Sequence, residues 1–154
     1  MGKRSIRENK NIYQTYREQN NLTMDKASEL MGTVSVARIE KIENGKSLPH
    51  ADEVLAMASC YKAPDLCNYF CSNECEIGKK YVPEVQSKDL ANIVLEVVAT
   101  LNNLEKDKDR LIEIAADGQI DEDEHTDFEY IKTQLEKIST SVESLKLWIE
   151  KNSK

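Results

Sequence analysis

The sequence contains few aromatic residues, glycines or prolines. Only 6% of its 154 residues are aromatic, whereas 40% are hydrophobic, and there are five glycines and three prolines. This composition is typical of helices that pack on Leu, Ile and Val. The length allows one ordinary domain or two small ones, and the apolar residues suffice for a hydrophobic core.

The sequence also lacks long hydrophobic runs. None approaches the roughly 18 uninterrupted apolar residues of a membrane span. The first ten residues, MGKRSIRENK, are basic but lack the apolar core of a signal peptide. We therefore expect a cytoplasmic protein that spans no membrane and whose thiols are mostly reduced.

Signatures of catalysis and cofactor binding are missing as well. The two histidines, His50 and His125, lie far apart, and there is no Gly-rich phosphate loop or Ser/His/Asp set. Residues 117–124 copy the second half of a calcium loop, but Glu113 and Ala115 stand where the first ligands belong. We expect neither an enzyme nor a bound cofactor or metal, and a capped helical turn explains residues 117–124 better.

The net charge of −7 is distributed unevenly. Residues 1–60 carry nine Lys and Arg against eight Asp and Glu, residues 61–80 three against three, and residues 81–154 nine against seventeen. A nearly neutral N-terminal part can bind nucleic acid only if its basic side chains gather on one face. The side chains that would have to gather are Lys3, Arg4, Arg7, Lys10, Arg38, Lys41 and Lys46.

The helical periodicity changes character along the chain. Short helical stretches, about five in number, fill residues 1–76. Gly78 then loosens the chain, and Pro83 forces Val82 toward extended geometry. We therefore predict an N-terminal domain over residues 1–76, a linker over 77–87 and a third segment over 88–154.

Residues 88–154 have the pattern of a long helical hairpin. Apolar residues recur every three or four positions along two arms of about 30 residues, separated by a turn at Asp117-Gly118. The predicted seam consists of Leu90, Val94, Val97, Leu101, Leu104 and Leu111, with Lys108 out of line, and of Phe128, Ile131, Leu135, Ile138, Val142, Leu145 and Ile149.

The apolar faces of this hairpin are wider than a two-helix seam. Ile93, Val98, Ile112 and Trp148 extend them. A second copy could cover the excess in a four-helix arrangement, which we favour, or the front domain could fold back. The simpler alternative is a hairpin that completes a monomeric core.

The most informative stretch is residues 22–49. It reads as a helix, a tight turn containing Gly32, and a second helix that ends in Glu43-Asn44-Gly45. Its motifs occur in order: Arg17, Leu22-Thr23, Met31-Gly32, Ile42-Glu43-Asn44-Gly45-Lys46 and Pro49. With these motifs, residues 12–66 resemble the lambda-repressor-like, or Xre, helix-turn-helix regulators. The resemblance implies an all-α protein with an N-terminal five-helix DNA-binding domain ahead of the hairpin.

The second helix of this motif supplies the candidate base-reading residues. Ser35 is placed to cap it, and Ile39 and Ile42 then face the core. The outward side chains are Val36, Ala37, Arg38, Glu40 and Lys41. The guanidinium of Arg38 could bind guanine, and the carboxylate of Glu40 could accept a hydrogen bond from cytosine. Val36 or Ala37 could touch a thymine methyl.

Other residues are expected to contact phosphates or to support the fold. Thr23 can cap the preceding helix, whose N-terminus suits a phosphate, and Ser35 is a second such position. The resemblance implies that Asn44 and Lys46 lie beside the DNA backbone and that Arg17 and Glu43 form an internal ion pair. Met24 is also expected at a phosphate. Two features depart from the family pattern: many relatives have a phosphate-binding Gln in place of Met24, and Thr33-Val34 make the turn one residue longer.

Four cysteines, Cys60, Cys67, Cys71 and Cys75, are all that the chain has. On a continuous helix the last three would form one stripe. Thiolates so spaced could bind a metal or sense redox state, but the paired C-x2-C of strong zinc motifs is missing. Apolar packing in the core is the interpretation that we favour.

These observations predict a cytoplasmic, homodimeric, sequence-specific transcriptional regulator, most plausibly a repressor. Two copies would read a two-fold symmetric double-stranded operator through residues 35–43 and pair through the hairpin. Two alternatives stay open: a module that binds another regulator through the acidic hairpin, and a cysteine-based metal or redox sensor that also binds DNA.

Overall fold

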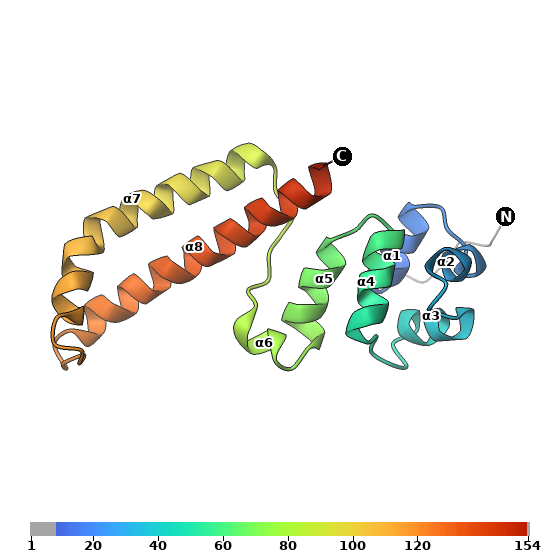
Figure 1. The fold of residues 1–154 in the computed structure, drawn as a ribbon, viewed down its shortest axis with the longest axis horizontal. Helices are drawn as coiled ribbons and strands as arrows, with labels where there is room; N and C mark the ends of the chain where they lie inside the picture. Colours follow the sequence, from blue (N-terminus) through green and yellow to red (C-terminus); the bar gives the residue numbers. More distant parts are fainter. Residues whose placement is uncertain (1–8, 154) are drawn as a thin grey trace. The chain divides into compact units, whose positions relative to one another are not determined.

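The computed structural model describes residues 9–153, whose path is drawn in Figure 1. All regular structure in that range is helical, which confirms the predicted all-α fold. The chain divides into two compact units, the first ending at Glu84 and the second beginning at Val85. Lys3, Arg4 and Arg7, three of the predicted basic residues, lie outside the described range. Over residues 9–153, no helix combines the length and apolar character needed to cross a bilayer.

The first unit opens with the five predicted short helices. They are α1 (Ile12–Gln19), α2 (Met24–Met31), α3 (Val36–Glu43), α4 (Ala51–Cys60) and α5 (Asp65–Tyr69). They surround one core, made of Tyr13, Ala27, Val34, Ile39, Ile42, Val54, Met57, Ala58, Tyr61, Ala63 and Leu66. Because every one of the five helices or its flanking turn contributes to this core, burial of apolar surface holds the unit together.

Side-chain caps fix where these helices begin. The side-chain oxygen of Asn11 accepts a hydrogen bond from the backbone N–H of Gln14 (2.9 Å), which starts α1. The amide nitrogen of Asn11 also donates to the carbonyl of Ile42 (2.7 Å). One residue therefore both begins α1 and ties it to the end of α3.

The first unit extends beyond the predicted domain end at residue 76. A π-helix, η1 (Phe70–Glu74), continues α5, and the short helix α6 (Gly78–Tyr81) packs against it. The Tyr13 hydroxyl donates to the carboxylate of Glu74 (2.7 Å), and the amide of Asn68 donates to the carbonyl of Pro83 (3.0 Å). The unit boundary after Glu84 falls inside the predicted linker 77–87, the first part of which is helical.

Gly78 does not loosen the chain, contrary to the prediction. It is buried at the start of α6, and an added Cβ would lie 2.0 Å from the carbonyl oxygen of Cys71. The absence of a side chain thus permits the close approach of α6 to η1. Val82, by contrast, has the predicted extended geometry (φ −112°, ψ 115°).

We expect Gly78→Ala to destabilise the first unit by about 1–3 kcal/mol, because the clash is with backbone and only a shift of α6 or η1 can relieve it. The measurement is urea unfolding followed by circular dichroism. Gly118→Ala, in the open turn of the second unit, is a control for strain without a clash, since nothing lies within 4 Å of its added Cβ. Equal stability of Gly78→Ala and the unaltered protein would contradict the tight contact.

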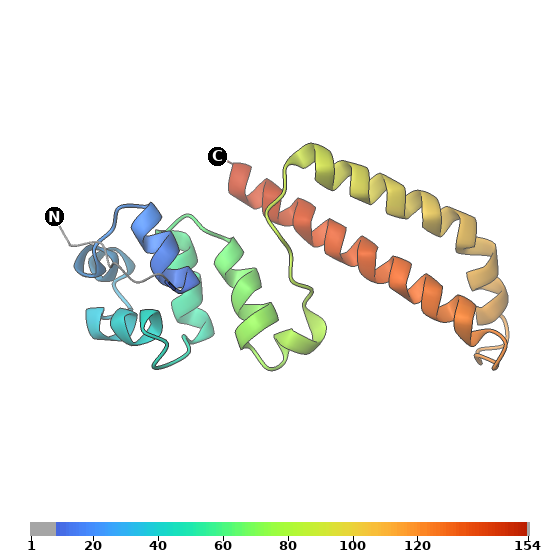
Figure 2. The same ribbon diagram turned by 180° about the vertical axis from the view of Figure 1, so that it is seen from behind.

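The second unit is a helical hairpin, as predicted. Its arms are α7 (Leu90–Ala115, 26 residues) and α8 (His125–Asn152, 28 residues), which run antiparallel side by side in Figures 1 and 2. Gly118 adopts the left-handed conformation (φ 74°) in the turn between them. An ion pair between Arg110 and Asp127 (2.8 Å) joins the two arms near the turn.

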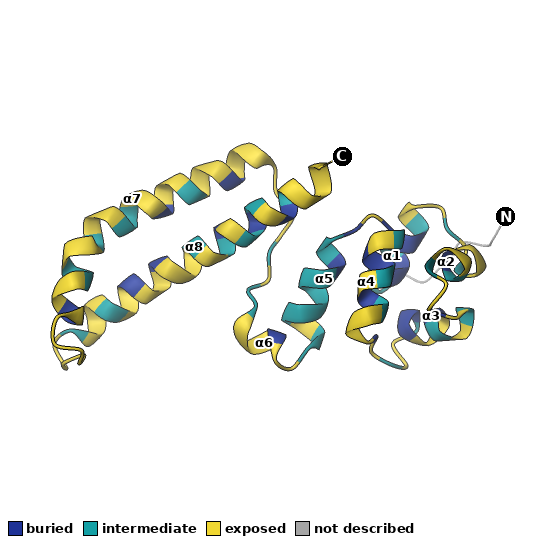
Figure 3. Ribbon diagram, viewed as in Figure 1, coloured by how far each residue is buried: buried dark blue, intermediate teal, exposed yellow. Residues whose placement is uncertain are grey.

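The seam of the hairpin differs from the predicted one. The most buried residues are Ile93, Thr100 and Ile114 on α7 and Ile131, Gln134, Ser141, Ser144 and Leu147 on α8. Only Ile131 belongs to the predicted seam. Six of the predicted residues are exposed instead, namely Leu90, Val94, Leu101, Leu135, Val142 and Ile149. The helices are therefore rotated so that one edge of each apolar stripe meets the other arm and the rest faces solvent (Figure 3).

Candidate DNA-binding interface

The turn between α2 and α3 is built by local hydrogen bonds. The hydroxyl of Thr23 accepts from the backbone N–H of Lys26 (3.1 Å), and that of Ser35 accepts from the N–H of Arg38 (3.3 Å). Gly32 ends α2 in the left-handed conformation (φ 69°). The predicted caps of both helices are thus confirmed, and they fix the angle at which α3 leaves the turn.

The extra residue in this turn has a structural role. Val34 is buried in the core, and its carbonyl accepts a hydrogen bond from the hydroxyl of Ser28 (2.7 Å). Thr33, beside it, is exposed. The longer turn is therefore anchored rather than loose, because one of the two side chains between Gly32 and Ser35 packs inside.

Helix α3 presents one face to the core and the other to solvent. Ile39, Ile42 and Glu43 are buried, as the spacing predicts for the two isoleucines. Ala37, Glu40 and Lys41 are exposed, and Val36 and Arg38 are half-buried. Three of the five candidate base-reading side chains thus lie fully on the solvent face, and Val36 borders it.

The fifth candidate, Arg38, has partners within the protein. Its Nε and Nη2 donate to the two carboxylate oxygens of Glu53, each at 2.7 Å, and it also donates to Ser47 Oγ and the carbonyl of Leu48. These bonds hold the α3–α4 loop closed. A guanidinium engaged in this way cannot also make the bidentate contact to guanine without breaking the pair.

Glu53 was missed in the sequence analysis, although a local signal pointed to it. It lies three residues after His50, and its carboxylate accepts from the backbone N–H of His50 (2.7 Å), as in a capping box. The hydrogen bonds from Arg38 lower the pKa of Glu53 below its ordinary value. Because the charged carboxylate is favoured in the folded state, the pair stabilises the fold above pH 4.5, and that contribution is lost as pH falls through the lowered pKa.

We expect Arg38→Met to lower the free energy of unfolding by about 1–2 kcal/mol at pH 7. The difference from the unaltered protein should shrink as pH falls through the lowered pKa of Glu53 and disappear once Glu53 is protonated in both proteins. Urea unfolding at a series of pH values measures it. A destabilisation that persists unchanged at acidic pH would show that Arg38 acts through packing alone.

The predicted phosphate-contacting residues do not all suit that role. Thr23, Ser35 and Lys46 are exposed, and Asn44 is half-buried at the C-cap of α3, next to Gly45 in the left-handed conformation (φ 68°). Met24 is the exception, because its side chain packs against the core and carries no hydrogen-bond donor. Only its backbone N–H, in the first turn of α2, could face a phosphate.

Arg17 and Glu43 form the internal ion pair that the resemblance implies. Arg17 Nε and Nη2 donate to the two carboxylate oxygens of Glu43 at 2.6 and 2.7 Å, and Nη1 donates to the carbonyl of Leu22 (2.6 Å). Only 7% of the arginine side chain and 2% of the glutamate side chain are exposed. The hydrogen bonds to Glu43 raise the pKa of Arg17, so the guanidinium stays charged. It joins α1 to the end of α3.

The four cysteines do not converge on a site. All are half-buried, and Cys60 and Cys67 pack against the core. The helix changes from α to π at Phe70 and ends before Cys75, so the three later cysteines do not continue on one α-helical stripe. Within residues 9–153, no group of three or more His, Cys, Asp or Glu side chains is arranged to hold a metal ion. Burial raises the pKa of the Cys60 thiol, which disfavours its reactive thiolate.

The comparison with known families agrees with this geometry. Residues 14–64 match the family model described as Helix-turn-helix, which spans α1 to α4 and the turn that follows. No curated protein and no solved structure matches the chain. The matched residues form a lambda-repressor-like helix-turn-helix domain, and they support a DNA-binding transcriptional regulator, a class that is typically not enzymatic.

Proposed function

We propose that this chain, whose residues 14–64 are a helix-turn-helix domain, is a sequence-specific transcriptional repressor in the cytoplasm. Two copies bind a two-fold symmetric operator and insert α3 into the major groove. The observation that carries the proposal is the solvent face of α3, where Ala37, Glu40 and Lys41 are exposed on a helix capped at Ser35.

The exposed side chains of α3 offer a mixed contact surface for base edges. Lys41 can donate to guanine, Glu40 can accept from the amino group of cytosine, and Ala37 with Val36 can touch a thymine methyl. Arg38 acts as a positioning residue, since its pair with Glu53 holds the loop that follows α3. We therefore assign base reading to Val36, Ala37, Glu40 and Lys41.

Phosphate contacts would flank this surface on both sides. Thr23 and Ser35 begin two successive helices, and their exposed N-terminal ends combine backbone donors with a partial positive charge. Lys46 and Asn44 follow α3 and add donors at its far end. Lys10 is paired with Glu18, so the positive charge near α3 rests mainly on Lys41 and Lys46.

The pairing of two copies follows from the geometry of DNA. Recognition helices in symmetric dimers lie about 34 Å apart, one turn of the duplex, so each reads one half-site. We assign this pairing to the second unit, whose exposed aliphatic side chains are those of a helix face that packs on another helix. A homodimer of this kind represses by occupying DNA that the transcription machinery needs.

The test is fluorescence anisotropy on a duplex obtained by random-site selection. Lys41→Ala should weaken binding about 5- to 100-fold and relax the preference at one base pair. Lys46→Ala should weaken binding equally on all sequences and lower the salt slope by about one. Lys79→Ala on α6 removes the same charge from a helix that packs on η1. It should change neither the affinity for DNA nor the salt slope.

Two outcomes would overturn the proposal. One is unchanged affinity in both Lys41→Ala and Lys46→Ala, which would exclude this face of α3. The other is the absence of salt-dependent retardation on any DNA at low salt, which would favour the competing role of a scaffold that binds another regulator.

A further inference from the structure

The hairpin has the heptad pattern of a coiled coil on both arms. On α8, Phe128, Leu135, Val142 and Ile149 are seven residues apart and occupy the a positions, while Ile131, Ile138 and Leu145 occupy the d positions. On α7, the a positions hold Val94, Leu101 and Lys108, and the d positions hold Val97, Leu104 and Leu111. A core seam of a and d residues is the usual contact surface of such helices.

The two arms meet through a different edge of this pattern. The buried residues Ile93, Thr100 and Ile114 on α7 and Gln134 and Ser141 on α8 all occupy g positions, one residue before each a position. Ile131, at a d position, is also buried, and near the end of α8 Ser144 and Leu147 are buried at c and f positions. The hairpin is therefore closed mainly by its g and d residues, and the a residues are left outside the contact.

The a residues of both arms consequently open on the same side of the hairpin. When two antiparallel helices meet through their g edges, their a and e positions lie together on one face. Half of the Leu101 side chain, 45% of Leu135 and 37% of Val142 are exposed, and the e residues Val98 and Ile112 are exposed beside them. We call this surface, made of the a and e positions of α7 and α8, the open face.

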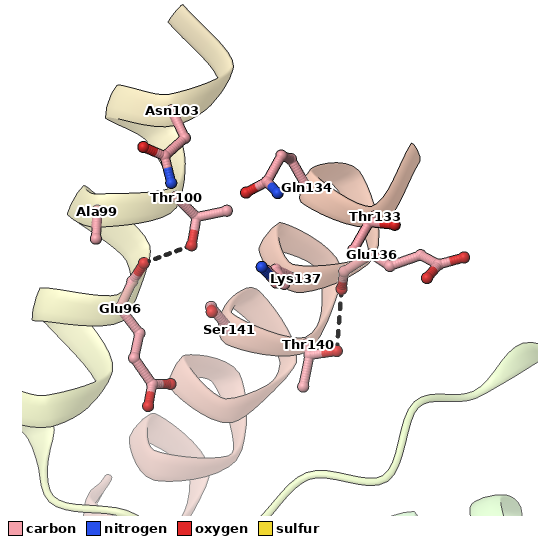
Figure 4. A pocket seen from close by; sticks show the side chains of 10 residues that line it. All are labelled: Glu96, Ala99, Thr100, Asn103, Thr133, Gln134, Glu136, Lys137, Thr140 and Ser141. Carbon is pink, nitrogen blue, oxygen red and sulfur yellow. Dashed lines mark hydrogen bonds between the residues drawn. The ribbon is translucent and has the colours of Figure 1, made fainter. Parts of the chain in front are cut away.

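The opposite side of the hairpin is polar. A groove there is lined by Glu96, Ala99, Thr100 and Asn103 of α7 and by Thr133, Gln134, Glu136, Lys137, Thr140 and Ser141 of α8 (Figure 4). The hydroxyls of Thr100 and Thr140 donate to carbonyls of their own helices, at 2.7 and 3.0 Å. Most of the exposed aliphatic side chains of the two arms thus belong to the open face, and Leu95 at a b position lies outside it.

We infer that a second copy of this chain covers the open face, so that two hairpins form a four-helix bundle with the a residues at its centre. The inference rests on the proposed function, in which two copies pair, and it names the open face as the surface through which they pair. Contact through one face of each copy gives a self-complementary, two-fold interface. Four-helix bundles of heptad helices use this packing around a common core.

The distribution of charge favours a like copy over an acidic or basic partner. Residues 85–154 carry sixteen Asp and Glu against nine Lys and Arg, so two such units repel each other wherever their acidic surfaces meet. On the open face, Glu105 is the one acidic residue of the a and e positions from 94 to 149, beside Lys108, Lys132 and Lys146. Each of these lysines pairs with a glutamate three residues earlier on its own helix, at 2.9, 3.2 and 2.8 Å.

The exposed area also matches what a stable dimer requires. Eight aliphatic side chains lie on or beside the open face: Leu90, Val94, Val98, Leu101, Ile112, Leu135, Val142 and Ile149. Each is roughly half exposed, so together they present on the order of 700 Å² of apolar surface, against about 800 Å² per partner in a standard stable interface. Neighbouring polar residues would supply the remainder.

The test uses two pairs of charged substitutions at the centre of the open face in the full chain. Leu101→Lys with Val142→Lys places lysines there, and Leu101→Glu with Val142→Glu places glutamates. Light scattering should give twice 17.6 kDa for the unaltered protein and 17.6 kDa for each variant alone. An equimolar mixture of the two variants should recover the doubled mass, because opposite charges then meet across the interface.

Controls separate this inference from loss of folding and from the proposed function. Asn102→Lys with Thr133→Lys adds the same charge outside the a and e positions and should leave the doubled mass unchanged. Recovery of mass on mixing excludes unfolding, since unfolded chains would not pair. A monomeric unaltered protein, or variants that keep the doubled mass, would overturn the inference even if DNA binding persists. A doubled mass without DNA binding would instead overturn the proposed function.

Discussion

Arg17→Met is expected to unfold the helix-turn-helix unit or to lower its free energy of unfolding by about 3–5 kcal/mol. The substitution leaves the Glu43 carboxylate, only 2% exposed, without the two hydrogen bonds that now neutralise it. A small domain has a total stability of about 5–15 kcal/mol, so the loss removes a large part of it. The effect should exceed that of Arg38→Met, whose partner Glu53 is more accessible to water.

The chain offers a way to measure the two units separately. Its one tryptophan, Trp148, lies on α8, whereas the Tyr13 and Tyr61 rings are in the first core. Circular dichroism should therefore show an early urea transition in Arg17→Met, while tryptophan fluorescence of the hairpin stays unchanged. Replacing both partners, in Arg17→Met with Glu43→Leu, should recover most of the stability, because no buried charge is left unpaired. A double variant as unstable as the single one would show that specific packing, and not the ion pair, dominates.

The second large effect concerns DNA affinity. The glutamate variant of the open face, Leu101→Glu with Val142→Glu, is expected to bind the symmetric operator about 100- to 10,000-fold more weakly than the unaltered protein. In a dimer, once one helix-turn-helix domain is bound, the second binds at a high effective concentration set by its connection to the first. A monomer loses this gain in affinity. Anisotropy measured on a duplex with one half-site should give the same affinity for the glutamate variant as for the unaltered protein.

Mixing again provides the decisive control. Adding the lysine variant to the glutamate variant should restore high affinity for the symmetric operator in step with the doubled mass. Asn102→Glu with Thr133→Glu, which adds the same negative charge outside the open face, should bind as the unaltered protein does. If the glutamate variant keeps full affinity for the operator, the two helix-turn-helix domains bind independently of the hairpin.

Local signals in the sequence were sufficient to predict the helix ends of the helix-turn-helix domain. Thr23, Gly32 and Ser35 mark helix ends through hydrogen bonds and backbone geometry that involve residues only a few positions away, so their roles could be predicted. The Arg17–Glu43 pair spans 26 positions, and only the family resemblance pointed to it. The base-reading role of α3 remains a prediction.

The sequence was least informative where a role depends on a distant partner. Arg38 reads as an outward-facing base contact until Glu53, fifteen residues away, is placed beside it. Gly78 reads as a flexible joint because its contact with the carbonyl of Cys71 cannot be seen in sequence. The heptads predicted two long helices correctly, but periodicity alone cannot tell whether helices meet through a and d or through g and d residues.

The bond between Asn68 and the carbonyl of Pro83 has a consequence for operator geometry. It attaches residue 83 to the first unit, so only residues 84–89 remain as a connection before α7 begins at Leu90. Six residues span at most about 20–22 Å when fully stretched. In the proposed dimer, tethers this short limit how far the two helix-turn-helix domains can separate, so a spacing between half-sites beyond their reach should weaken binding.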